Sequence, residues 1–186
     1  GIHNDNAVAT ISNTLVYSNA AAFGGGIWSN GDFSRFTVDG NSIIAANQAS
    51  VYAGGIGNTE GNFTVNASRI FANHGTNYGG GLYGSNGRLR VNDSQVYSNS
   101  AQNGGGVYSE GGAQVIISAS VVATNTAVAD GGGLFNTGSG STISVTNSSI
   151  LSNTAGSGGA FHQAAGSSQV TGSCIVGNRD IALNNE

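Results

Sequence analysis

The chain has 186 residues, with 32 glycines, no proline and 8% charged residues, and its five arginines against nine acidic residues leave a net charge of −4. Hydrophobic residues make up 38% of the chain, too many for a disordered protein, and the helical 3.6-residue apolar period is missing. No basic stripe suits a nucleic acid, and no apolar run is long enough to span a bilayer. We therefore expect one β-rich domain, residues 1–186, with no nucleic-acid partner and no membrane span.

The first predicted element of each repeat is a short strand that follows a run of glycines. The runs precede a hydrophobic residue in six places, at Ile27, Ile56, Leu82, Val107, Leu134 and Phe161. Glycine carries no Cβ, so these runs fit places where main chains approach closely or turn sharply. No lysine or helical pattern follows the runs, which excludes a P-loop for phosphate.

The second predicted element is a strand whose apolar residues alternate with polar ones. The alternating pairs are Phe36/Val38, Phe63/Val65, Leu89/Val91, Val115/Ile117 and Ile143/Val145. Alternation with a period of two residues is typical of a strand that buries one face.

The third predicted element ends on an asparagine that recurs seven times, at spacings of 28, 26, 26, 26, 28 and 25 residues. A β-branched residue stands three residues before each asparagine, and Ser or Thr stands five residues before it. Asparagine tolerates a left-handed backbone, and its amide can bond to coils above and below. The seven are Asn19, Asn47, Asn73, Asn99, Asn125, Asn153 and Asn178.

Three strands per repeat, each too short to be stable alone, must bury their apolar faces against neighbouring repeats. Stacking at about 4.8 Å per rung places like residues on like residues. Parallel crossovers are nearly always right-handed. The sequence therefore predicts an all-β, right-handed parallel β-helix of about seven coils, roughly 26 residues each, with three short sheets.

A second column follows the hydrophobic residue of each glycine-led strand, and alternation predicts that it faces outward. An exposed aromatic column could stack on sugars or dock against a protein, so we take its aromatic members as candidate binding residues. The alternative is that these side chains stack on one another and cover the outer face. The candidates are Trp28, Tyr83, Tyr108 and Phe135, with Gly57 and His162 at the same station.

Catalytic and metal-binding groups are sparse. Asp39 and Asp93 near one corner, with Arg69 and Arg90, are the nearest approach to a carbohydrate-cleaving site. The three histidines occupy unrelated stations, so we predict no metal site and no cofactor. Cys174 stands beside the β-branched column, which predicts a buried structural thiol.

The pairing of "GGAF" with "IFAN" resembles the GGA(I/L/V) and FxxN repeats of chlamydial polymorphic membrane proteins, which are autotransporters. Most coils here have GGG instead of GGA, and Tyr, Ala or Leu instead of Phe. The pattern also looks like that of large secreted β-helix proteins named after pectate lyases. The resemblance implies an extracellular or cell-surface passenger, with surface glycans or a host or cell-surface protein as partners.

We expect a non-catalytic stalk, passenger or adhesin-like segment, and an excerpt of a longer secreted protein. The alternative is a polysaccharide-binding or pectate-lyase-like carbohydrate-active enzyme. Neither end carries lysine or proline to protect its open strand edges, which predicts end-to-end association.

Overall fold

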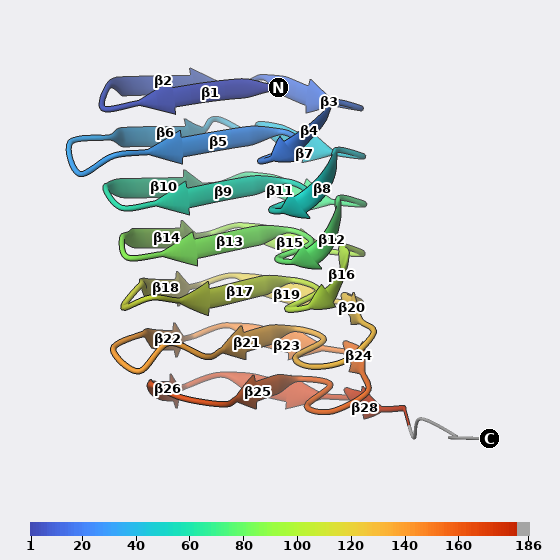
Figure 1. The fold of residues 1–186 in the computed structure, drawn as a ribbon. Coiled ribbons are helices and arrows are strands. Elements are labelled where there is room, and N and C mark those ends of the chain that lie inside the picture. The colour runs from blue at the N-terminus through green and yellow to red at the C-terminus, as the bar shows by residue number, and fades with distance from the viewer. Residues whose placement is uncertain (182–186) are drawn as a thin grey trace.

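The protein is a right-handed parallel β-helix of seven coils, seen in a computed structural model that describes residues 1–181. In Figure 1 the chain passes leftward along the front of a coil and rightward along its back while it descends, which is the right-handed sense. Every coil contributes one strand to each of four seven-stranded parallel sheets, here called A to D.

Sheets A and B contain the first and second strands of the coils. Sheet A consists of β1 (Ile2–Asp5), β5 (Ile27–Asn30), β9 (Ile56–Thr59), β13 (Leu82–Ser85), β17 (Val107–Glu110), β21 (Leu134–Asn136) and β25 (Phe161–Gln163). Sheet B consists of β2 (Val8–Ser12), β6 (Arg35–Asp39), β10 (Asn62–Asn66), β14 (Arg88–Asn92), β18 (Gln114–Ser118), β22 (Thr142–Thr146) and β26 (Ser167–Thr171).

Sheets C and D contain the third and fourth strands. Sheet C consists of β3 (Leu15–Tyr17), β7 (Ile43–Ala45), β11 (Arg69–Phe71), β15 (Gln95–Tyr97), β19 (Val121–Ala123), β23 (Ser149–Leu151) and β27 (Cys174–Val176). Sheet D consists of β4 (Ala20–Phe23), β8 (Gln48–Tyr52), β12 (His74–Tyr78), β16 (Ser100–Asn103), β20 (Thr126–Ala127), β24 (Thr154–Ala155) and β28 (Arg179–Asp180).

Sheet D corrects the prediction of three sheets. Its buried positions hold small residues, such as Ala49, Ala101 and Ala127, so no large hydrophobic residue marks the strand in the sequence. The strands form because their main chains pair between coils, as Gly75 does with Ala49 and Ala101. Main-chain pairing needs no apolar alternation.

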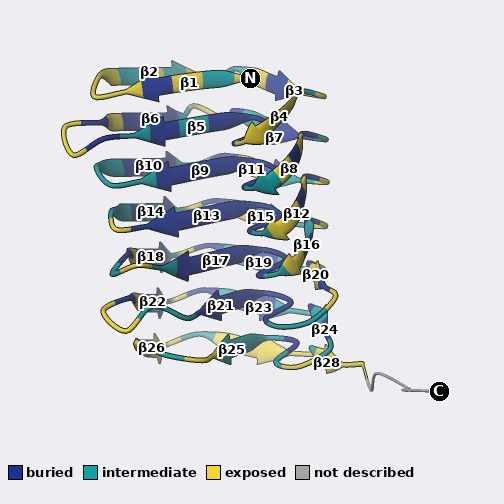
Figure 2. Ribbon diagram, viewed as in Figure 1, coloured by how far each residue is buried: buried dark blue, intermediate teal, exposed yellow. Residues whose placement is uncertain are grey.

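The predicted apolar columns form one continuous core inside the tube. Ile27, Ile56 and Leu82 from sheet A pack with the alternating pairs of sheet B and the β-branched column of sheet C. Phe36 and Phe63 stack on each other with ring centroids 5.1 Å apart. Figure 2 shows this interior as buried through the middle coils, whereas the last coil is mainly exposed or half-buried.

The asparagine column is an unbroken hydrogen-bonded ladder. From Asn47 onward, the side-chain oxygen of each asparagine accepts two bonds from the asparagine one coil earlier, one from its main-chain N–H and one from its Nδ2. For Asn99, both bonds from Asn73 measure 3.0 Å. The Nδ2 of Asn99 donates in turn to Asn125 and to the carbonyl of Ile70. Every polar atom of a middle asparagine side chain is thus bonded while buried.

The left-handed turn lies one residue before the asparagine, which corrects the prediction that the asparagine itself adopts it. Ser18, Ala46, Ala72, Ser98, Thr124 and Ser152 have φ values of 52–55°, and Gly177 completes the column. The asparagines keep ordinary backbone angles. Their side chains support the turn by bonding across coils, so the residue type is selected by its amide rather than by its backbone.

The exposure of Cys174 and of apolar side chains at the end of the rod bears on two predictions from the sequence. Cys174 is exposed, contrary to the predicted burial, because the first residue of each sheet C strand points outward and only the middle residue points inward. The last coil leaves inward-facing apolar side chains uncovered, with Val170 41% and Ile175 49% exposed. End-to-end association stays a prediction that these open faces favour.

Replacing Asn99 with alanine should destabilise the fold strongly. The change removes the acceptor of two buried Asn73 N–H bonds and leaves the main-chain N–H of Asn73 without a partner, so we expect a loss of at least about 2 kcal/mol in the free energy of unfolding. Asn19→Ala is the matched control, since Asn19 is half-buried at the end of the same ladder, and should cost under about 1 kcal/mol. Urea unfolding measures both, and equal losses would contradict the ladder's role.

Candidate functional site

The outer aromatic column, predicted to face solvent, is largely buried. Tyr83, Tyr108 and Phe135 are 3%, 4% and 7% exposed, and Trp28 is half-buried. These residues do point away from the main core. A second row of side chains from sheet D, Phe23, Tyr52 and Tyr78, packs against them. The prediction of exposure was therefore wrong for the three residues, and the alternative of mutual stacking describes them.

The two rows form an aromatic rib along the edge between sheets A and D. Trp28, Tyr83, Tyr108 and Phe135 pack in sequence, with ring centroids 6.1, 5.7 and 5.1 Å apart; the first two pairs are stacked and the last is tilted. The second row joins them where Tyr52 lies 5.2 Å from Tyr83 and Tyr78 lies 4.6 Å from Tyr108. We call the seven aromatic residues of both rows the aromatic rib.

The second row was missed in the sequence, although a signal was present. Phe23, Tyr52 and Tyr78 are aligned in adjacent coils, and each lies at the end of its sheet D strand, just ahead of a glycine run. Without knowledge of sheet D, these residues look like the start of a loop. Once sheet D is known, these residues form a second aromatic row beside the row of Trp28, Tyr83, Tyr108 and Phe135.

Gly57 makes room for the only tryptophan. It occupies the station of Trp28 and Tyr83 in the coil between them, and a Cβ built on it would overlap Cε3 and Cζ3 of the Trp28 ring. The absent side chain therefore lets the indole lean across a full coil and reach Tyr83.

A carboxylate closes the polar edge of the rib. The hydroxyl of Tyr83 donates to Oε1 of Glu110, and the hydroxyl of Tyr108 donates to Oε2 of the same residue at 3.2 Å. Burial is the largest cause that raises the pKa of both phenols above the ordinary value, and the adjacent Glu110 raises the pKa of each further. The two phenols therefore act as fixed hydrogen-bond donors.

The four residues suggested for a carbohydrate-cleaving site do not lie together in the structure; they are Asp39, Asp93, Arg69 and Arg90. Arg69 and Asp93 line one small hollow beside sheet C, whereas Arg90 lies on the outer face of sheet B in another hollow. Asp39 ends β6, two coils before Asp93, and pairs with Ser12 instead. Two rungs alone separate the acids by about 9.6 Å. The structure does not gather the four around one point.

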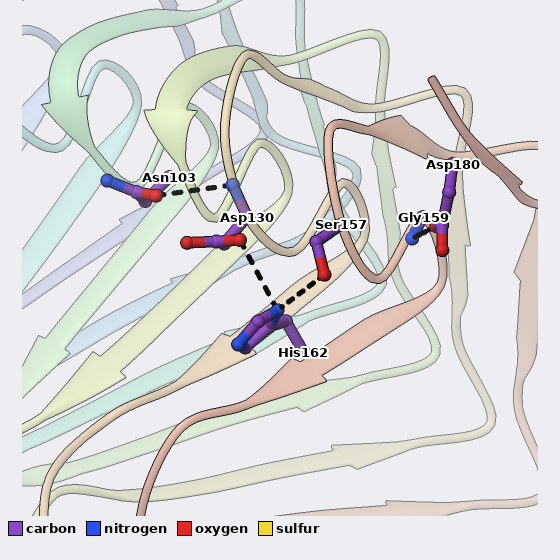
Figure 3. A network of polar contacts seen from close by, with 6 residues as sticks. All are labelled: Asn103, Asp130, Ser157, Gly159, His162 and Asp180. Carbon is purple, nitrogen blue, oxygen red and sulfur yellow. Dashed lines mark hydrogen bonds and ion pairs between the residues drawn. The ribbon is translucent and has the colours of Figure 1, made fainter. Parts of the chain in front are cut away.

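A serine, a histidine and an aspartate do meet at the far end of the aromatic column (Figure 3). Nδ1 of His162 lies 3.3 Å from Oγ of Ser157 and 3.4 Å from Oδ1 of Asp130. In a catalytic triad the serine and the acid sit on opposite ring nitrogens, so that the ring relays a proton. Here both oxygens approach the same nitrogen, so this half-buried cluster has no relay geometry.

Within residues 1–181 no three histidine, cysteine or carboxylate side chains come together as a metal site requires. The same residues contain no helix long and apolar enough to cross a membrane. Comparison of the chain with known protein families, curated proteins and solved structures finds no match.

Replacing Gly57 with alanine should displace Trp28, because the new methyl group overlaps its ring. We expect a loss of roughly 1–3 kcal/mol in unfolding free energy and a red shift of the tryptophan emission as the indole meets water. Gly84→Ala is the control, since its nearest neighbour would lie 3.6 Å away. An unchanged emission spectrum in Gly57→Ala would refute the packing.

Tyr83 and Tyr108 should stay protonated in the folded protein at a pH where a free tyrosine, with a pKa of about 10, has ionised. Unfolding above that pH then releases protons, so stability should fall as the pH rises further. Glu110→Gln should lower both pKa values without restoring the ordinary one, because burial persists. Tyrosinate absorbance measures this, with Glu60→Gln as the charge-matched control. Identical titration curves for wild type and Glu110→Gln would disprove the coupling.

Proposed function

We propose that this chain is a non-catalytic rod segment, a stalk or passenger, of an extracellular or cell-surface protein. The observation that carries the proposal is the continuity of the asparagine ladder from Asn19 to Asn178. Each coil is joined to the next by four sheets and by this side-chain ladder, with no coil left out. A rod of this kind has no hinge along its length, which suits a spacer that holds other parts at a distance.

The fold supports a second part of the proposal, that the rod presents surfaces to glycans or to other proteins at a cell surface. The outward column of sheet B holds polar residues such as Arg35, Asn62 and Arg88, so packing in the core does not restrict these positions to apolar residues. Long repeat proteins use such continuous surfaces for binding. The repeat pattern's resemblance to autotransporter passengers points in the same direction.

A carbohydrate-cleaving enzyme is the rival function, and the placement of its candidate residues argues against it. Glycosidases need two carboxyl groups about 5–9.5 Å apart on either side of the bond to be broken. Asp39 and Asp93 stand two coils apart in different columns, and Arg69 and Arg90 belong to separate hollows.

Removal of one repeat tests the rod directly. Deletion of residues 120–147 joins Ala119 to Ser148 and keeps the register of the ladder, because Asn125 and Asn153 are 28 residues apart. We expect a folded protein whose long dimension, measured by small-angle X-ray scattering, is shorter by about 4.8 Å. Collapse of the whole fold would contradict a modular rod.

The catalytic rival is tested on the intact chain. Polygalacturonate, with and without Ca²⁺, should yield no new reducing ends and no unsaturated products. Cleavage by the wild type that Asp39→Asn or Asp93→Asn abolishes would overturn the proposed function. Arg179→Gln serves as a control substitution away from both acids.

A further inference from the structure

Three of the five arginines gather on the outer face of sheet B. Arg35 lies in β6, and Arg88 and Arg90 lie in β14, two coils later. The strand register places Arg35, Asn62 and Arg88 in one column, with Thr37, Thr64 and Arg90 in the next outward column. Together these side chains line an open hollow of about 430 Å³.

The positive charge of this face is not neutralised by the protein. No carboxylate lines the hollow, and within residues 1–181 none of the three arginines forms an ion pair. Asp32 lines the adjoining hollow together with Arg88, without forming an ion pair with it. The chain as a whole has a net charge of −4, so a group of three guanidinium ions gives this face a charge of the opposite sign.

The guanidinium groups are also partly pre-positioned. Nε and Nη2 of Arg88 donate to Oε1 of Gln114 at 3.0 and 2.6 Å, which holds the group along the sheet toward the next coil. Arg35 and Arg90 have no side-chain hydrogen bond to the described residues, so their donors are free for a ligand. Planar guanidinium groups bind carboxylate and sulfate oxygens in pairs.

We propose that this face, from β6 to β14, binds an acidic polysaccharide whose carboxylates or sulfates pair with Arg35, Arg88 and Arg90. Arg35 and Arg88 are two rungs, about 9.6 Å, apart, so a polymer with repeated anionic groups fits better than a single small anion. Asn62, Thr37 and Thr64 lie between the arginines and offer donors and acceptors for sugar hydroxyls.

A single-stranded nucleic acid fits this face less well. Such ligands are held by aromatic side chains on which bases stack. The aromatic residues of these strands, Phe36 and Phe63, are buried in the core beneath the face, and the exposed Phe33 lies in the turn before β6, a single ring where several bases would need to stack. The polysaccharide site does not depend on the chain's serving as a stalk, and deletion of residues 120–147 leaves all seven residues that line the hollow in place.

Binding is measured by fluorescence anisotropy with end-labelled oligogalacturonate and heparin oligosaccharide, which separate carboxylate from sulfate recognition. Neutral dextran and a single-stranded oligonucleotide complete the probes. At about 50 mM salt we expect one or both acidic saccharides to bind more tightly than dextran and the oligonucleotide, and to weaken at about 200 mM.

The variants Arg35→Gln, Arg88→Gln and Arg90→Gln should each weaken binding at least about fivefold, because each removes a charge-assisted pair. Arg69→Gln is the matched control, since it removes the same charge from sheet C, and should change binding less than about twofold. Arg88→Lys keeps the charge but not the planar fork, so we expect an intermediate loss. Circular dichroism and the urea midpoint verify that each variant is folded.

Three results would overturn the proposal. The first is that neither acidic saccharide binds better than dextran, and the second is that the oligonucleotide binds as tightly as the saccharides. The third is that Arg69→Gln weakens binding as much as Arg88→Gln. The last would mean that only net charge matters. Because Arg35 is exposed, Arg35→Gln remains informative even if a substitution in β14 unfolds the protein.

Discussion

The hydrogen bond between equivalent positions of successive coils is the interaction on which the whole structure depends. It fixes the rung spacing at about 4.8 Å, so each side chain lies directly over its counterpart in the next coil. Asparagine suits this geometry because its amide both donates and accepts along the same direction, as Asn73 and Asn99 do. Buried polar columns of this kind are stable only when every member is bonded.

The same spacing explains the aromatic rib. Rings in adjacent coils are brought within stacking distance whether or not they face the core, so an outward aromatic column gains contacts along the rod axis. Sheet D then lies beside sheet A and adds Tyr52 and Tyr78. The rib forms a second, smaller hydrophobic core outside the tube. Gly57 leaves the space that the large Trp28 ring occupies within it.

The repeat and its inward columns were predictable because identical stacking environments select identical residues, and seven copies make the selection visible. Sheet D was not predictable, since its buried positions accept alanine or glycine and leave no apolar alternation. Cys174 and Tyr83 both stand next to an inward residue, so alternation within each strand places both at outward positions. Tyr83 is nevertheless buried because side chains of sheet D cover it, and no pattern within one strand records that cover, whereas Cys174 stays exposed. The dispersal of Asp39, Asp93, Arg69 and Arg90 likewise depends on the corner geometry between sheets.

Outward columns differ from inward ones in how freely their residues change from coil to coil. On sheet B the inward column reads Phe36, Phe63, Leu89, Val115 and Ile143, all apolar, whereas the outward column beside it reads Arg35, Asn62, Arg88, Gln114 and Thr142. Nothing in the fold requires arginine there, because the main-chain ladder forms with any of these residues. Packing does not select arginine at these positions, and among residues 1–181 the three arginines have no ion-pair partner. The proposed acidic-polysaccharide site rests on these two observations.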